Sequence, residues 1–164
     1  MLRSLRMKSR IYIETSVVSY LTSLPSRDLI VAAHQEITRE WWAHRRNDFT
    51  IAISALVIDE ASRGDPDASQ QRLTALTDIE SMMISPEAVT LAEALVARGA
   101  LPAKARADAL HVALAAIWKA DYLLTWNCTH IANGEALPLI ESTLRDLGHV
   151  PPRILTPLEM MGTN

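Results

Sequence analysis

Residues 10–16 read Arg-Ile-Tyr-Ile-Glu-Thr-Ser, and the rest of the chain is best interpreted outward from this stretch. Its β-branched and aromatic side chains predict a buried strand over residues 10–14. The strand ends on Glu14, in an otherwise apolar context. A carboxylate there is costly to desolvate unless it is paired or holds a cation. Glu14 is therefore a candidate site residue; the alternative is that it only caps the next helix or pairs with a lysine.

The remaining chain alternates between strand-like and helix-like segments. After the first strand we expect a break. Further strands are expected at residues 49–53, 79–84, 121–125 and 153–155. Helices are expected at residues 28–46, 55–61, 67–76, 86–98, 103–119 and 137–147, with Ser54 and Ser85 as N-caps. Strands separated by helices pair in parallel through crossover connections. The predicted fold class is α/β, a three-layer α/β/α domain around a mostly parallel sheet of about five strands.

Length and composition set the outer limits. The chain has 164 residues, of which 49% are hydrophobic, which is enough for one core. We predict one domain over residues 10–164, preceded by a basic extension at residues 1–9 that is the part most prone to disorder. No apolar run reaches the roughly 18 residues that a membrane span needs, and no signal-peptide pattern follows the basic start. With a single cysteine, Cys128, the chain is predicted to be cytoplasmic.

Three more polar residues are candidates for the same site. Glu60 lies on the predicted helix at 55–61, Asp108 lies on an alanine-rich helix, and Asn127 follows the strand at 121–125. Parallel sheets bind ligands beyond the carboxyl ends of their strands, so these side chains could converge with Glu14. For each acid alone, a solvated helix face or an ordinary salt bridge is the competing interpretation. His111, one turn from Asp108, is more typical of a satisfied buried histidine.

Three carboxylates and an amide oxygen are hard ligands that suit Mg²⁺ or Mn²⁺. Zinc is disfavoured, because the five histidines lack ligand-like spacing and there is no second cysteine. A nucleotide-binding fold is disfavoured because no glycine-rich loop follows any strand. The net charge of −3 does not by itself suggest nucleic acid, although it would suit a cation site.

Taken together, several segments resemble the PIN-domain family and, within it, the VapC-type toxins of bacterial toxin–antitoxin pairs. The matching segments, in family order, are Tyr-Ile-Glu-Thr-Ser at 12–16, Glu-Ala-Ser-Arg-Gly at 60–64, Asp-Ala-Leu-His-Val-Ala at 108–113 and Ala-Asp-Tyr-Leu-Leu-Thr-Trp-Asn at 120–127, with His130 nearby. The match extends from residue 10 to about residue 156.

The resemblance implies a metal-dependent endoribonuclease that hydrolyses RNA phosphodiester bonds, a small antitoxin partner and a homodimer. By motif position, Glu14, Glu60 and Asp108 match catalytic, metal-binding acids of the family. Asn127 stands where a fourth acid often lies, and Thr125 matches a supporting hydroxyl residue. Arg63, Lys104 and Arg106 neighbour the acidic motifs and are candidates for binding RNA phosphates, or else are exposed solubilising charges.

The chain departs from the family pattern at two of these positions. Glu14 replaces the usual aspartate, and Asn127 removes one negative charge, which favours one bound metal over two. The alternative function is a degenerate, non-cleaving PIN domain that binds RNA or protein. A phosphotransferase with a nucleophilic aspartate after the first strand is disfavoured, because Glu14-Thr15-Ser16 does not supply that residue. A nucleophilic pair of Cys128 with His130 would need a third, orienting group that the sequence does not reveal.

Overall fold

The computed structural model of the protein describes residues 7–162, so residues 1–6 of the predicted basic extension lie outside the described part. Five strands form one sheet in the order β3-β2-β1-β4-β5. The strands are β1 (Arg10–Ile13), β2 (Thr50–Ser54), β3 (Glu80–Met82), β4 (Tyr122–Leu124) and β5 (Arg153–Leu155). All four neighbouring pairs are parallel. The predicted α/β class with a five-stranded parallel sheet is confirmed.

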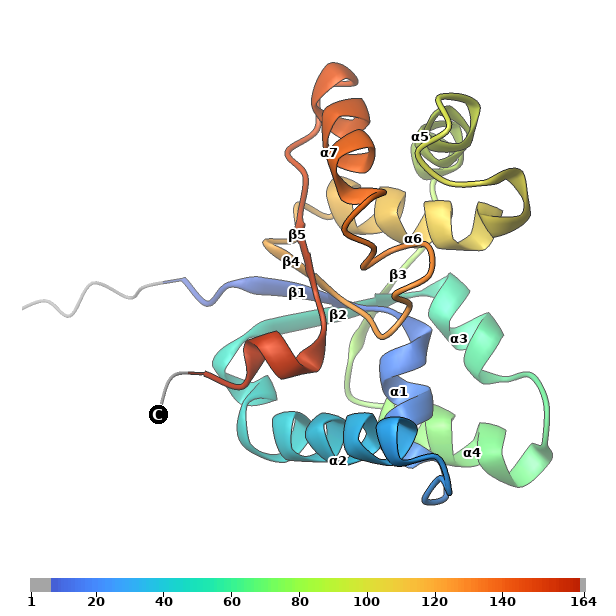
Figure 1. Ribbon diagram of the computed structural model, residues 1–164, viewed down its shortest axis with the longest axis vertical. Coiled ribbons are helices and arrows are strands. Elements are labelled where there is room, and N and C mark those ends of the chain that lie inside the picture. The colour runs from blue at the N-terminus through green and yellow to red at the C-terminus, as the bar shows by residue number, and fades with distance from the viewer. Residues whose placement is uncertain (1–6, 163–164) are drawn as a thin grey trace, which may run out of the picture.

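Helices cover both faces of the sheet, which gives three layers (Figure 1). On one side lie α5 (Pro86–Ala97), α6 (Arg106–Ile117) and α7 (Leu137–Asp146). On the other side lie α1 (Thr15–Thr22), α2 (Leu29–His44) and α4 (Pro66–Ala75), while α3 (Ala55–Ala61) follows directly on β2. Three short 3₁₀ turns complete the described elements: η1 (Arg46–Asp48), η2 (Ala103–Ala105) and η3 (Pro157–Met160).

The helix caps largely follow the sequence, but α1 does not. Ser54 and Ser85 accept hydrogen bonds from the backbone N–H groups of Val57 and Ala88, as the predicted N-caps require. The break expected after the first strand is wrong, because residues 15–22 form α1. Their sequence, Thr-Ser-Val-Val-Ser-Tyr-Leu-Thr, is rich in β-branched residues of low helix propensity. Burial of Val17 and Val18 beneath the sheet stabilises the helix where propensity does not.

The sheet reverses its strand order beside β1. From β1 the chain moves outward through β2 to β3, and it then crosses to the other side of β1 to add β4 and β5. The carboxyl ends of β1 and β4 therefore flank a topological switch point, the usual place for a ligand in an open parallel sheet. Glu14, a predicted strand-end residue, directly follows β1. Asn127, the other one, lies three residues after the end of β4.

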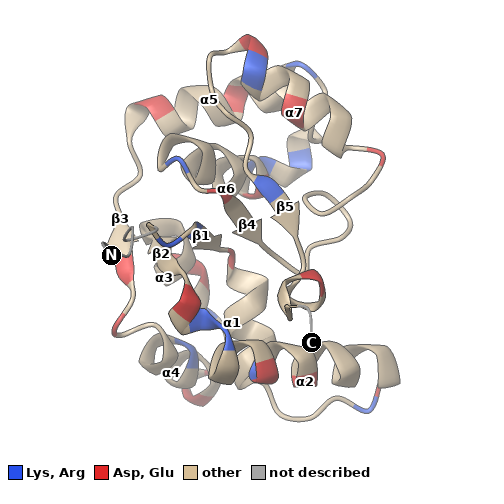
Figure 2. Cartoon of the chain, turned by 90° about the vertical axis from the view of Figure 1, so that its left-hand side faces the viewer, with Lys and Arg blue, Asp and Glu red and all other residues tan. Residues whose placement is uncertain are grey.

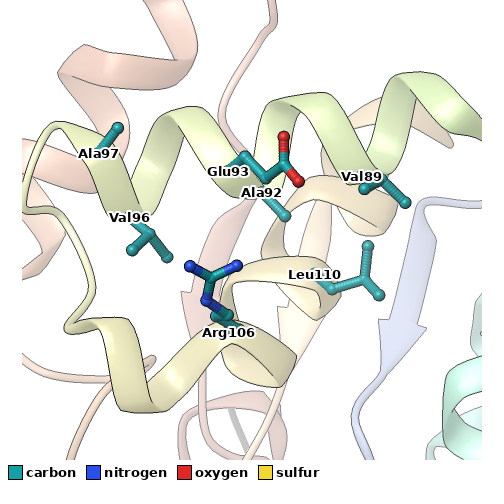
Figure 3. A pocket seen from close by; sticks show the side chains of 7 residues that line it. All are labelled: Val89, Ala92, Glu93, Val96, Ala97, Arg106 and Leu110. Atoms are coloured by element: carbon teal, nitrogen blue, oxygen red, sulfur yellow. The ribbon is translucent and has the colours of Figure 1, made fainter.

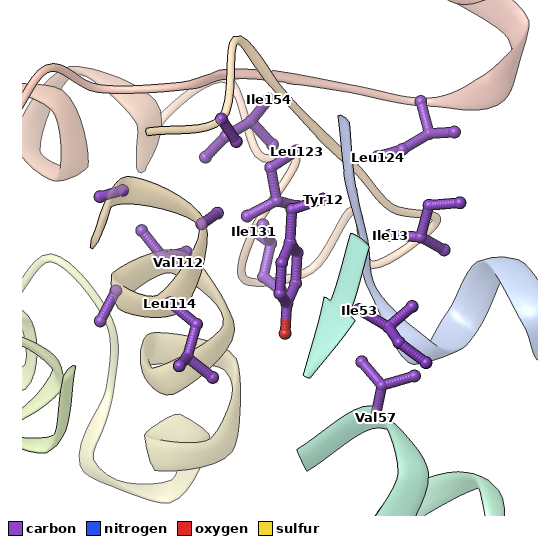
Figure 4. Packing of buried hydrophobic residues seen from close by; sticks show 14 of the residues in the cluster. Tyr12, Ile13, Ile53, Val57, Val112, Leu114, Leu123, Leu124, Ile131 and Ile154 are labelled. Atoms are coloured by element: carbon purple, nitrogen blue, oxygen red, sulfur yellow. The ribbon is translucent and has the colours of Figure 1, made fainter. Parts of the chain in front are cut away.

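The core lies between the sheet and its helix layers. Figure 4 shows Tyr12, Leu123 and Ile154 from three adjacent strands packed near Val112 and Leu114 of α6, while Ile13 and Ile53 point toward the opposite layer. The small residues of α6, among them Ala109 and Ala113, are fully buried and let this helix approach the sheet closely. Within residues 7–162, no helix is long and apolar enough to cross a membrane.

Replacing Leu123 by alanine tests this packing. Leu123 is fully buried on β4, where it pairs with Tyr12 and Ile154 of the neighbouring strands. We expect the substitution to lower the free energy of unfolding by about 2–5 kcal/mol, the usual effect of Leu→Ala in a core. Urea unfolding measures it. The matched control is Leu24→Ala, at a side chain that is 86% exposed, and a similar loss in both variants would contradict the described core.

Candidate active site

Glu14 lies at the switch point as the N-cap residue of α1, with its side chain almost completely buried. Its backbone N–H donates to the carbonyl of Leu124 at 3.0 Å, which extends the β1–β4 ladder by one residue. The carboxylate oxygen Oε2 accepts hydrogen bonds from the Ser16 hydroxyl and from the Thr125 hydroxyl, the latter at 2.7 Å. Two hydroxyl donors therefore partly offset the desolvation of this carboxylate.

Glu60 reaches the same place from the last turn of α3. Its Oε2 lies 2.9 Å from Nε2 of His111 and accepts a hydrogen bond from the Thr15 hydroxyl. Burial raises the pKa of Glu60, but the hydrogen bond from His111 and the electrostatic interaction with that ring lower it. The Thr15 hydrogen bond and the nearby charge of Arg63 act in the same direction, so the net pKa lies below its ordinary value of 4.5. Glu60 is consequently ionised at neutral pH.

Together these side chains form a compact group, which we call the glutamate cluster: Glu14, Glu60 and His111. One ligand atom from each lies within 4.8 Å of the others. His111 is 1% exposed, and its Nε2 is 4.0 Å from Oε1 of Glu14. The sequence predicted the two glutamates as site residues, and the fold brings them together. It also predicted a satisfied buried histidine at 111, which agrees with the burial, but it did not reveal that the ring contacts Glu60.

Asp108 lies in the first turn of α6, near the cluster along the helix but outside the 4.8 Å group. Its Oδ2 lies 2.8 Å from Nδ1 of His130, and both side chains are about one-fifth exposed. We call these two residues the Asp108–His130 pair. From the sequence, no hydrogen-bonding partner could be assigned to His130. In the structure its partner is Asp108, 22 positions earlier in the chain. Such a pairing depends on how the loop after β4 folds back over α6.

Asn127 uses its side chain locally. Its Oδ1 accepts the backbone N–H of His130 at 3.0 Å, and its carbonyl accepts from the N–H groups of Ile131 and Ala132. Its own N–H donates to the Thr125 hydroxyl at 2.9 Å. The amide thus stabilises the turn that carries His130. A role for Asn127 as a metal ligand stays a prediction.

Supporting hydroxyl residues connect the two groups. Thr125 is fully buried and touches Glu14 on one side and the backbone of Asn127 on the other. These contacts are compatible with the supporting role predicted for Thr125, which stays a prediction. The contacts of Thr15 with Glu60 and of Ser16 with Glu14 were not predicted from the sequence. The signal was present in the motif itself, because a helix that starts at Thr15 directs two hydroxyls back toward the end of β1.

The three predicted phosphate-binding residues lie on the surface outside the cluster. Arg63 forms an ion pair with Asp59 one turn away on the same segment. Lys104 in η2 and Arg106 at the start of α6 are both exposed, near Asp108 in the chain. Figure 3 shows Arg106 extending toward α5. Arg106 lines a groove of about 460 Å³ whose other lining residues are mainly apolar. None of the groove residues belongs to the glutamate cluster. Figure 2 shows that positively and negatively charged residues are spread over both helix layers.

One comparison with known proteins adds to this geometry. The chain is similar to a chain in the crystal structure of VapBC2 from Rickettsia felis bound to a DNA fragment from their promoter. The two chains share 16% sequence identity with a TM-score of 0.58, over 90% of this chain and 98% of that one. No protein-family model matches the sequence, and no curated protein sequence matches it. At this identity the likeness shows the fold, and it confirms the PIN-like three-layer architecture that the sequence resemblance implied.

The lowered pKa of Glu60 leads to a prediction about stability. Because its pKa is lower in the folded than in the unfolded state, the carboxylate contributes stability above its ordinary pKa of 4.5. That contribution is lost as the pH falls through the folded-state pKa. We expect the difference in unfolding free energy between wild type and Glu60→Gln to shrink on acidification below pH 4.5, measured by urea unfolding in EDTA. A difference that stays constant or grows with acidification would contradict this assignment.

Proposed function

From the PIN-like fold and the carboxylates at its switch point, we propose that the chain is a metal-dependent endoribonuclease. The substrate is RNA, whose phosphodiester bonds are hydrolysed, and the protein acts as the toxin of a toxin–antitoxin pair. The observation that carries the proposal is the glutamate cluster, in which ligand atoms of Glu14, Glu60 and His111 lie within 4.8 Å of one another at the end of β1. Two acids this close, one of them nearly buried, favour a cation between them.

The free oxygen atoms of the cluster fit a divalent metal ion. Within the described residues, Oε2 of each glutamate accepts the hydrogen bonds, whereas Oε1 of Glu14 and Oε1 of Glu60 accept none. Carboxylate oxygens are the ligands that Mg²⁺ and Mn²⁺ prefer. We propose that Glu14 and Glu60 hold the ion, with Asp108 of α6 and Asn127 of the loop after β4 as further ligands. A bound ion of this kind lowers the pKa of water and stabilises charge on a phosphate.

The surrounding side chains orient the acids. The hydroxyls of Ser16 and Thr125 fix the Glu14 carboxylate, and Thr15 fixes that of Glu60. His130 holds Asp108, whose carboxylate stays one-fifth exposed and so accessible to a strand of RNA. We propose the catalytic roles for Glu14, Glu60 and Asp108, and a supporting role for Thr125.

A second candidate function is a degenerate PIN domain that binds RNA or protein without cleavage. The observation that favours it is the Asn127 side chain, whose oxygen accepts a backbone hydrogen bond from His130. A neutral and already engaged ligand holds a cation less strongly than a fourth carboxylate does. Calorimetric titration with Mg²⁺ and Mn²⁺ separates the two functions, since a degenerate site binds either ion weakly or not at all.

The partner and the cellular setting belong to the same proposal. The similar structure is that of a complex named VapBC2, which supports a small antitoxin protein as the partner of this chain. We also propose a homodimer, one domain over residues 10–164 and a cytoplasmic location. Co-purification with the products of adjacent open reading frames identifies the antitoxin, and light scattering measures the oligomeric state.

Cleavage of a total-RNA pool tests the nuclease proposal directly. We expect the wild type to give discrete products with Mg²⁺ or Mn²⁺ and none with EDTA. Asp108→Asn keeps the shape of the side chain but removes its charge, so we expect cleavage to fall by more than about 100-fold, the scale of removing one group that stabilises the transition state. Gel analysis of 5′-labelled products measures the rate.

The matched control for Asp108→Asn is Asp146→Asn, at the end of α7 in an exposed ion pair with Arg98. This control should cleave like the wild type. Full activity of Asp108→Asn would remove Asp108 from the site. Silence of the wild type with both metals, together with weak metal binding, would favour the degenerate function.

Salt dependence tests the proposed phosphate contacts. Each phosphate contact on a single strand contributes about 0.7 to the slope of log K against log salt concentration. If Lys104 and Arg106 each bind one phosphate, the double alanine variant should weaken RNA binding and lower that slope by about 1.4. Fluorescence anisotropy with the cleavage-deficient Asp108→Asn background measures it. The same double change at Arg98 and Arg145, which pair with surface acids, is the control and should leave the slope nearly unchanged.

A further inference from the structure

A chain of buried polar side chains runs across the sheet and ends on Glu60. The Ser54 hydroxyl lies 2.7 Å from the Tyr12 hydroxyl, which lies 2.8 Å from Nδ1 of His111. Nε2 of the same ring lies 2.9 Å from Glu60 Oε2. Tyr12, Ser54 and His111 are at most 1% exposed, so the hydrogen bonds of these groups must be made within the protein. Figure 4 shows the Tyr12 ring pointing into the space between α6 and β2.

One end of this chain of side chains is the N-cap of α3. The backbone N–H of Val57 donates to Ser54 Oγ at 3.4 Å, because Ser54 caps α3. Ser54 can then donate to Tyr12, and Tyr12 can donate to Nδ1 of His111. An Nδ1 that accepts leaves the proton of a neutral ring on Nε2, where it donates to Glu60.

The opposite direction leaves a group unsatisfied. If Nδ1 of His111 donated to Tyr12, Tyr12 would donate to Ser54, whose own proton would then have no acceptor among the described residues. A buried hydroxyl without an acceptor is costly. Nε2 would also present a lone pair to the ionised carboxylate of Glu60 at 2.9 Å. The first direction satisfies every polar group, and the second does not.

We propose that His111 is a positioning residue: as the neutral Nε2–H tautomer, set by Tyr12 and Ser54, it holds the Glu60 carboxylate in the cluster. The inference rests on the proposed function for the role of Glu60 in catalysis. It assigns His111 as a hydrogen-bond donor and not as a metal ligand, although its ring lies among the ligand atoms of the cluster. The arrangement ties Glu60, on the short helix α3, to the central strand β1 and to α6.

Imidazole nitrogen shifts of ¹⁵N-histidine-labelled protein read the tautomer directly, without RNA or metal. In EDTA at mildly alkaline pH we expect His111 as the Nε2–H form, and we expect Mg²⁺ to leave it in that form. Tyr12→Phe removes the donor to Nδ1 with little change of shape, so the Nδ1 resonance should shift while Glu60 still holds the proton on Nε2. An Nδ1–H ring in the wild type, or an Nδ1 resonance that Tyr12→Phe leaves unchanged, would overturn the inference.

Kinetics supply the second measurement. We expect His111→Leu to lower kcat by about 10–100-fold, the usual scale for a residue that orients a metal-binding group. KM should change little. His111→Gln keeps an N–H donor near the position of Nε2 and should restore most of the rate, which a merely space-filling role would not explain. Melting temperatures of both variants show whether each is folded.

The two measurements separate this inference from the proposed nuclease function. A wild type that is silent with both metals and binds them weakly refutes the nuclease, and the imidazole nitrogen shifts of His111 in wild type and Tyr12→Phe then decide the inference alone. Equal kcat in His111→Leu and wild type, with active enzyme, overturns the positioning role and leaves the nuclease proposal intact.

Discussion

The buried carboxylate of Glu14 is the constraint on which the site depends. It ends the central strand, where the parallel ladders to β2 and β4 leave it little contact with water. An ionised group in that position needs donors or a cation. The hydroxyls of Ser16 and Thr125 supply two donors, and both come from segments that the sheet itself brings to the end of β1. The side of Glu14 that these hydroxyls leave free faces His111, beside Glu60.

Much of the fold follows from the sequence because its signals are local. Strand residues are β-branched or aromatic, Ser54 and Ser85 precede helices, and the alternation of elements dictates parallel pairing. The exception is α1, whose β-branched residues resemble a strand more than a helix. Its helical state comes from packing beneath the sheet, and packing cannot be read from a stretch of eight residues.

The site was predictable in part, for a similar reason. Strand ends and a short motif pointed to Glu14 and Glu60, and the sheet topology brings these two together. The partners of the other residues depend on tertiary contacts that no spacing reveals. Asp108 meets His130 only because the turn capped by Asn127 folds against α6, and His111 meets Tyr12 across 99 residues of chain.

The parallel sheet has a further consequence for how the molecule reaches this state. Each strand pairing needs a crossover, and the pairing of β1 with β4 joins Tyr12 to Leu123, far apart in the chain. Loop closure over such separations is entropically unfavourable until many contacts form together, so folding is slower than in helical proteins of low contact order. The contacts around Glu14 depend on the same long-range pairing, because Thr125 and Glu14 are 111 positions apart in the chain. In a nascent or unfolded chain, Glu14, Glu60 and Asp108 are therefore present but not brought together. Any chemistry that depends on their proximity begins only when the whole domain has folded.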